Sequence, residues 1–269
     1  NVEGRMLFLA YAARAHLAAG DPARALAATR RACKLHRAAG LASLDAIERS
    51  ELWWRHCQAL RACGLDAEAD EALAQAWRFV LDSLESLGDE GLRRNLLNKP
   101  EATREIVRAW LSHARRHKLP RAQREPHLAG TANPGEPFER LVDTGLRLNE
   151  LKSESDLREF LVDEVTELSG AERVLLLLET PGGVEVAGAE LPPGEDPAAV
   201  LDDIGPWIDE ARRTRAVSLR NVPTRAKPID QRSSIVVPLI AQRELAGYLY
   251  ADIDGPFGRF RGADRDLLA

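Results

Sequence analysis

Apolar residues in the first 119 positions recur at intervals of three and four, and runs of β-branched residues are almost absent. This spacing predicts amphipathic α-helices rather than strands. Two stretches align at an offset of 44 residues, and each has a glycine between two helical patterns. Small residues are expected where paired helices cross closely, and glycine permits the backbone shape of the turn. The aligned positions are Ala13, Gly20, Ala25 and Ala32 in the first stretch and Cys57, Gly64, Ala69 and Ala76 in the second.

A third helical unit is predicted over residues 87–117. Its second part begins at Pro100, a residue that suits the first turn of a helix. An apolar stripe follows, from Ile106 to Leu111. The longest clean apolar run of the chain, Met6 to Ala13, is too short to span a bilayer and is expected to be helix core. The sequence therefore predicts a helical first half and no membrane-spanning segment.

Prolines and glycines replace the apolar pattern between Lys118 and Phe138. Such a composition is typical of a loop or linker. We therefore expect helical repeats over residues 1–119, a linker over 120–137 and a second domain over 138–269, which agrees with the chain length of 269 residues. The two domains carry net charges of +4 and −9, so the mild total of −5 hides two segments of opposite sign.

Helices and strands alternate differently after the linker. The order helix, helix, strand, strand, helix, strand, strand, strand indicates a multi-domain chain that ends in an α+β domain with a mainly antiparallel sheet. The run from Arg173 to Glu179 is continuously apolar inside, which predicts a buried strand. The other expected elements are helices over 138–151, 157–168 and 197–213, a strand over 184–191, and a hairpin of strands 234–240 and 247–253.

Motifs in both halves resemble known families. The small-residue and turn positions of the repeat resemble a tetratricopeptide-type repeat, in a variant with helices longer than the usual 34-residue period allows. The second half resembles a GAF domain in the order of its last strands and helix. The motifs are Arg232 to Leu239, Glu244 to Asp252, and Phe257-x2-Phe260-x3-Asp264-x2-Leu267-Leu268. The chain ends where that family begins its closing helix, so we expect a fragment of a longer protein.

The GAF resemblance implies a small-molecule sensor or dimerisation module, with ligands that include cyclic nucleotides, haem, bilins and iron centres. All six histidines and all three cysteines precede residue 138. Haem, a covalently attached bilin and a His- or Cys-ligated metal are therefore disfavoured in the second domain, and the cofactor stays unknown. The cysteines, Cys33, Cys57 and Cys63, lack the spacing of a disulfide framework, which suggests reduced thiols in a cytoplasm.

Seven cations lie between residues 212 and 232 of this acidic domain. They would raise the local affinity for an anion, although such a run is more often a solvated loop. Arg265 after Asp264 departs from the cyclic-nucleotide signature of the GAF family. A small anionic ligand is expected to contact the helix around one tryptophan and the loop over 221–234. The candidate ligand-binding residues are Trp207, Arg220, Asn221, Arg232, Ser233 and Ser234.

His113 and His117 lie four positions apart on a predicted helix, a spacing that can bring two imidazoles to one metal. No third ligand is evident nearby in the sequence, and the two histidines lie in a basic last turn that suits the negative helix end. We therefore predict no metal site. Because the second half has no histidine, a Ser-His-Asp or Cys-His system is unavailable there. We expect this segment to have no catalytic residues and not to be an enzyme.

The first helix of the second domain has an apolar stripe that is either an intrachain packing face or a parallel dimer seam. The resemblance favours a homodimer of the full-length protein. The stripe consists of Phe138, Leu141, Val142, Leu148 and Leu151.

The combined pattern predicts a regulatory segment of a bacterial, cytoplasmic signalling protein. In it the repeats bind a protein or neighbouring domain, and the GAF domain binds a small molecule or dimerises to control an output domain such as a nucleotide cyclase, histidine kinase or ATPase. The alternative is a ligand-free interaction and dimerisation module, which a cavity filled by side chains would favour. Nucleic-acid binding is not expected, because the first half lacks a dense basic stripe.

Overall fold

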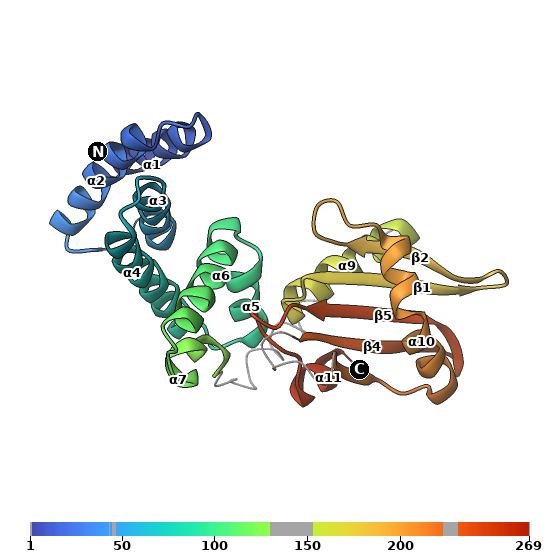
Figure 1. The fold of residues 1–269 in the computed structure, drawn as a ribbon. Helices are drawn as coiled ribbons and strands as arrows, with labels where there is room; N and C mark the ends of the chain where they lie inside the picture. The colour runs from blue at the N-terminus through green and yellow to red at the C-terminus, as the bar shows by residue number, and fades with distance from the viewer. Residues whose placement is uncertain (1, 43, 45–46, 130–152, 223–230, 269) are drawn as a thin grey trace. The chain divides into compact units, whose positions relative to one another are not determined.

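The computed structural model describes residues 2–42, 44, 47–129, 153–222 and 231–268. The chain forms two compact units (Figure 1). The first comprises Asn1–Ser86 with Pro100–Ala129, and the second comprises Leu87–Lys99 with Gly130–Ala269. The predicted dimer helix at residues 138–151 lies outside the described residues. Each unit has its own core and is described by itself.

The first unit is entirely helical in its described part. Both predicted helix–glycine–helix stretches form, and Gly20 and Gly64 have φ of 74° and 73°, a left-handed turn conformation that side-chain-bearing residues resist. The tetratricopeptide likeness of these pairs stays a prediction. The elements are α1 (Val2–Ala18), α2 (Pro22–Ala38), α3 (Arg49–Ala62), α4 (Asp66–Glu85), α6 (Glu101–Arg116), α7 (Arg121–Arg124) and the 3₁₀ turn η1 (Pro126–Leu128).

Small residues form the contacts between these helices, as predicted. Ala13, Ala25, Ala32, Ala69 and Ala76 are all fully buried. A methyl group at each crossing lets paired helices approach closely, and the larger core side chains fill the spaces beside the crossings.

The apolar run at the start of α1 is only partly core. Met6, Ala10 and Ala13 are buried, whereas Phe8 and Tyr11 are exposed. The run thus differs from a uniformly buried helix, because its apolar residues surround the helix instead of following one stripe. None of the helices in the described part of the chain is long and apolar enough to cross a membrane.

The second unit contains a five-stranded, fully antiparallel sheet in the order β2-β1-β5-β4-β3. The buried run predicted at 173–179 is β1, and Val174 to Leu177 are buried because helices cover both faces of the sheet. The strands are β1 (Arg173–Thr180), β2 (Gly183–Glu190), β3 (Ser218–Val222), β4 (Arg232–Ala241) and β5 (Glu244–Ile253).

Two helices cover opposite faces of this sheet (Figure 1). Helix α10 (Pro197–Thr214) packs through Ile204 and Ile208 on Leu175 and Leu177 of β1. Helix α9 (Glu154–Ser169) packs on the other face of β1 and β2, where Val162 meets the strand backbone at Gly188. The helical turn α11 (Gly262–Leu268) closes the described chain.

The predicted third helical unit over 87–117 is wrong in its first part. Helix α5 (Glu90–Asn98) packs against α9 in the second unit, whereas α6 belongs to the first. Helix α5 ends at Asn98 and α6 begins at Glu101, and Pro100 between them lacks the N–H that a continuous helix would need. The second unit is therefore built from two separate stretches of sequence, and the predicted division at residues 120–137 does not account for α5.

Helix α5 is held by polar side chains that satisfy the last turn of α9. Asn95 Nδ2 donates to the Glu167 carbonyl at 2.9 Å and Asn98 Nδ2 donates to the Gly170 carbonyl at 2.7 Å. The Glu167 carbonyl lies in the last turn of α9 and the Gly170 carbonyl at its C-cap, where the helix itself supplies no donors, so α5 provides these hydrogen bonds. A Cβ on Gly91 would lie 2.0 Å from the Leu168 carbonyl oxygen, so glycine is required for this close approach.

Candidate functional site

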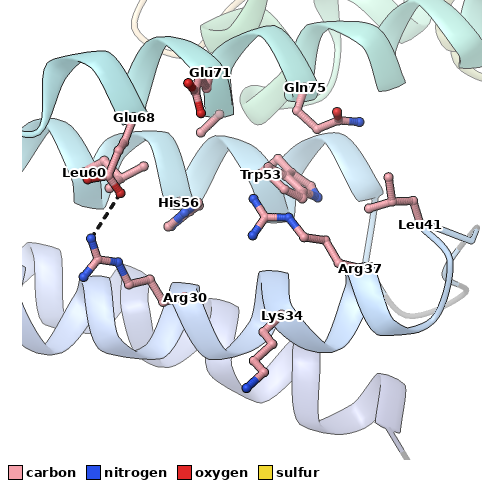
Figure 2. A pocket seen from close by; sticks show the side chains of 11 residues that line it. Arg30, Lys34, Arg37, Leu41, Trp53, His56, Leu60, Glu68, Glu71 and Gln75 are labelled. Carbon is pink, nitrogen blue, oxygen red and sulfur yellow. Dashed lines mark hydrogen bonds and ion pairs between the residues drawn. The ribbon is translucent and has the colours of Figure 1, made fainter.

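A groove of about 590 Å³ lies on the helical unit between α2 and α4, with α3 as its floor (Figure 2). One wall is basic and the other is acidic or polar. Helix α2 contributes Arg30, Lys34 and Arg37, helix α4 contributes Glu68, Glu71 and Gln75, and helix α3 contributes Trp53, His56 and Leu60.

The positions of the wall residues follow from helix geometry. Arg30, Lys34 and Arg37 are spaced by four and three residues, which places them on one face of α2. Arg30 reaches across the groove to Glu68, with an Nη2–Oε2 distance of 3.1 Å, at one end of the view in Figure 2. Both side chains of this ion pair are about half exposed, so it is weak and can exchange for a ligand's charges.

Trp53 gives the floor an aromatic surface whose orientation is fixed. Its Nε1 donates to His36 Nδ1 at 3.0 Å, and the buried His36 in turn donates from Nε2 to the Ala42 carbonyl at 3.0 Å. The Arg37 guanidinium carbon lies 4.7 Å from the Trp53 ring centroid, at cation–π distance. The floor is therefore rigid where it meets the basic wall.

His56 lies between the two ends of the groove and is uncharged at neutral pH. Burial, reinforced by the positive charges of Arg37 and Arg30, lowers its pKa to about 4. The Thr29 hydroxyl donates to the Leu26 carbonyl at 3.2 Å, so His56 Nδ1, 2.9 Å from that hydroxyl, acts as its hydrogen-bond donor. This tautomer leaves Nε2 as an acceptor.

These features suit a peptide segment with charges of both signs. A basic and an acidic wall favour opposite charges on the two sides of a bound chain, and an aromatic floor favours apolar contact between them. The sequence alone does not reveal this groove, although the spacing of the cations on α2 and of the acids on α4 places each set on one helix face. The sequence does not show which faces of α2, α3 and α4 meet, because this depends on how the helices pack in the folded chain.

The structure brings together two of the predicted GAF ligand residues. The Arg220 guanidinium lies 5.7 Å from the ring of the half-buried Trp207, and the guanidinium also pairs with Glu210 on α10. Trp207 lies on α10 and Arg220 lies on β3, an edge strand of the sheet. Asn221 pairs with Ser233 in the β3–β4 ladder, so the predicted loop over 221–234 begins and ends in strands.

Ser233, Ser234 and Arg232 lie in β4, and the two serines are buried. Ser233 Oγ accepts from the Phe260 amide at 3.0 Å, which ties the chain before α11 to the sheet. Arg232 Nη2 donates to Glu172 at 2.8 Å. The described contacts of Ser233 and Arg232 are thus made within the domain.

Arg232 belongs to a charged cluster around Asp252, a fully buried carboxylate. Arg173 Nε lies 3.0 and 2.9 Å from its two oxygens, and Arg232 and the Tyr250 hydroxyl also donate to it. Burial alone would lower the pKa of Arg173, but the hydrogen bond and charge of Asp252 outweigh it and raise that pKa. Burial and the same carboxylate raise the pKa of Tyr250, so its hydroxyl stays a donor. This cluster lies where β1 and β4 begin and β5 ends, at one end of the sheet.

Side chains fill the interface between α10 and the sheet. Buried residues from both layers form one cluster, and Trp207 packs at its margin with its ring 6.3 Å from that of Tyr250. The cluster consists of Leu175, Leu177, Val200, Ile204, Ile208, Ala211, Val236, Tyr248 and Tyr250. The described residues between α10 and the sheet thus form a packed core, and residues 223–230 of the expected ligand loop lie outside the described residues.

The five-stranded sheet with α9 and α10 on its two faces defines a GAF-type fold. Residues 157–269 match the model of the GAF domain family, and this part of the chain is a GAF domain. No curated protein matches the chain.

Solved structures of GAF domains are also similar to the chain. That of an Acinetobacter phosphoenolpyruvate-protein phosphotransferase is 16% identical over 50% of this chain and 86% of its own, with a TM-score of 0.37. A Synechocystis GAF domain in its photoproduct state is 20% identical over 40% and 80%, with a TM-score of 0.31. That of a protein described as a sensor histidine kinase from Pseudomonas syringae pv. tomato is 18% identical over 49% and 78%, with a TM-score of 0.33.

Proposed function

We propose that residues 1–269 are a regulatory segment of a bacterial signal-transduction protein and that they work by binding, not by catalysis. The helical unit binds a peptide segment of a partner protein or neighbouring domain in the groove between α2 and α4. The observation that carries this proposal is the groove itself, with a cationic wall, an acidic wall and a fixed aromatic floor. The output domains expected above stay predictions.

A peptide selection tests the groove directly. The full chain is immobilised and used to select from a displayed library of random twelve-residue peptides. We expect enriched peptides that carry acidic residues on one side of an apolar residue and basic residues on the other, because these complement the two walls. Absence of enrichment would contradict the proposal.

A matched pair of variants locates the binding site. Lys34→Glu reverses a charge on the groove wall, and Arg31→Glu makes the same change at an exposed position of α2 that does not line the groove. We expect the first variant to weaken a selected peptide at least tenfold and the second to change it less than twofold. Equal effects would place the binding site elsewhere.

For the GAF domain, the filled α10 interface favours the ligand-free alternative over a small-molecule sensor. In that role the domain mediates interaction and dimerisation. Native mass spectrometry of the purified chain is the discriminating measurement: a ligand-free module gives the mass of the polypeptide, whereas a retained small molecule would support the sensor. Light scattering on the same sample tests the homodimer, which a strict monomer at high concentration would contradict.

A further inference from the structure

The helical unit places a carboxylate beside the two histidines that are spaced four apart on α6. His113 Nδ1 lies 3.2 Å from Asp70 Oδ1, and His117 Nε2 lies 3.7 Å from Asp70 Oδ2. The two imidazole rings are 4.3 Å apart between centroids. One ligand atom from each of the three residues lies within 4.8 Å of the others.

From these positions we propose that Asp70, His113 and His117 bind one divalent transition-metal ion with the ligand preferences of Zn²⁺. Two imidazoles and one carboxylate are a donor set that zinc accepts, with a water molecule as fourth ligand. Bond lengths of about 2.1 Å in a tetrahedral site separate neighbouring ligand atoms by about 3.4 Å. The distances of 3.2 and 3.7 Å to Asp70 bracket this value but run to different carboxylate oxygens, and the ligand atoms are spread over as much as 4.8 Å, so the side chains must move closer together to hold the ion.

Asp70 supplies the negative charge at this position, and Arg61 and Arg116 bring positive charges near it. His113 Nδ1 is buried and has no hydrogen-bond partner among the described residues, although it lies 3.2 Å from Asp70 Oδ1, so this nitrogen is available as a ligand. Arg61 Nη2 is 3.6 Å from Asp70 Oδ1, within ion-pair range but too far for a hydrogen bond, so a bound metal ion would replace this pair as the partner of the carboxylate.

Exposure and packing match a site that is fixed on one side and open on the other. The His113 side chain is 14% exposed and its ring stacks on Trp110 at 5.5 Å, whereas the His117 side chain is 53% exposed. Solvent can therefore supply the fourth ligand from the His117 side. Because Asp70 comes from α4 and both histidines come from α6, the metal would join two helices that already pack together.

The sequence contains the two histidines at metal-binding spacing but does not reveal the third ligand. Asp70 is 43 positions before His113 and lies on a different helix. Only the packing of α4 against α6 makes it a neighbour.

Calorimetric titration of the full chain with Zn²⁺, after treatment with a chelator and with thiols kept reduced, tests the proposal. We expect one ion per chain with a dissociation constant in the micromolar range or tighter. His117→Gln and Asp70→Asn should each weaken binding at least tenfold, and Zn²⁺ should raise the melting temperature of the wild type but not of Asp70→Asn. Both substitutions are at partly exposed side chains, so the variants are expected to fold.

Two control variants and a second probe separate this site from adventitious binding. His16→Gln removes an imidazole from α1, and Cys63→Ser removes the most exposed thiol; both should keep the wild-type affinity within twofold. Ni²⁺ should quench tryptophan fluorescence in the wild type, because Trp110 stacks on His113, and should quench it much less in His117→Gln. The absence of Zn²⁺ binding, unchanged binding in Asp70→Asn, or loss of binding in Cys63→Ser would each overturn the assignment.

Discussion

Arg94 is the residue on which the contact between α5 and the GAF domain most depends. Its guanidinium is buried, donates to both oxygens of Asp264 at 2.6 and 3.0 Å, and also donates to the carbonyls of Ser169 and Arg259 at 2.9 and 2.8 Å. One side chain thus connects α5, the end of α9 and the start of α11.

Arg94→Met should lower the free energy of unfolding by about 3 to 5 kcal/mol, because it leaves the Asp264 carboxylate buried without its cation. Urea denaturation followed by circular dichroism measures the change. Arg265→Met removes the exposed arginine of the Arg265–Asp266 pair and should cost less than about 1 kcal/mol. Similar losses in the two variants would show that the buried pair has no special role.

His56 should make the stability of the helical unit depend on pH. Its pKa is about 4 in the folded chain and about 6.5 when unfolded, so between these values the unfolded chain binds more protons. Stability is therefore lost as the pH falls from about 6.5 towards 4. His56→Asn keeps a donor towards Thr29 but does not titrate, so it should lose less stability than the wild type between pH 7 and pH 5 in urea denaturation. An equal loss would contradict the neutral, buried state of His56.

At the scale of elements, the contact of α5 with α9 depends on glycine. Gly91→Ala would place a methyl carbon against the Leu168 carbonyl, and separating the helices should cost about 1 to 3 kcal/mol. Gly205→Ala, within α10, has no heavy atom within 4 Å of the added Cβ and should instead stabilise by about 1 kcal/mol through helix propensity. Thermal melts should shift in opposite directions; a lower melting temperature for both would contradict this account of the α5–α9 contact.

Elements with a local pattern could be predicted from the sequence. The strand predicted over 173–179 is observed as Arg173–Thr180, and the helix predicted over 197–213 is observed as Pro197–Thr214. The repeat of small residues also predicted the two helix–glycine–helix pairs, which form around Gly20 and Gly64. In each case the hydrophobic period or the turn residue lies within the element itself.

Contacts between distant positions could not be predicted in this way. Arg94 and Asp264 are 170 residues apart, and nothing near α5 in the sequence marks it as part of the second unit. The same limit applies to the groove and to Asp70, because one sequence shows which face of a helix is apolar but not which helix will cover it. The candidate ligand residues follow from the run of cations and from the position of the loop beside the α10 helix, and charge does not distinguish a solvated arginine from one that pairs with Glu172 and Asp252.

At the scale of the whole molecule, each unit has a core of its own. The core of the helical unit includes alanines at the helix crossings and buried tryptophans. The core of the GAF domain lies on both faces of its sheet. The helical unit carries the open groove, whereas the described α10 face of the GAF domain is filled. We therefore expect recognition in the helical unit and a regulatory role for the GAF domain.

The most direct test of this account is a charge exchange between the groove and a selected peptide. Glu71→Lys reverses a charge on the acidic wall. We expect it to weaken the wild-type peptide at least tenfold, and a peptide whose facing basic residue is changed to glutamate to recover most of that loss, measured by calorimetric titration. If no basic position of the peptide restores binding when reversed, Glu71 does not face the peptide, and the proposed groove is not where the partner binds.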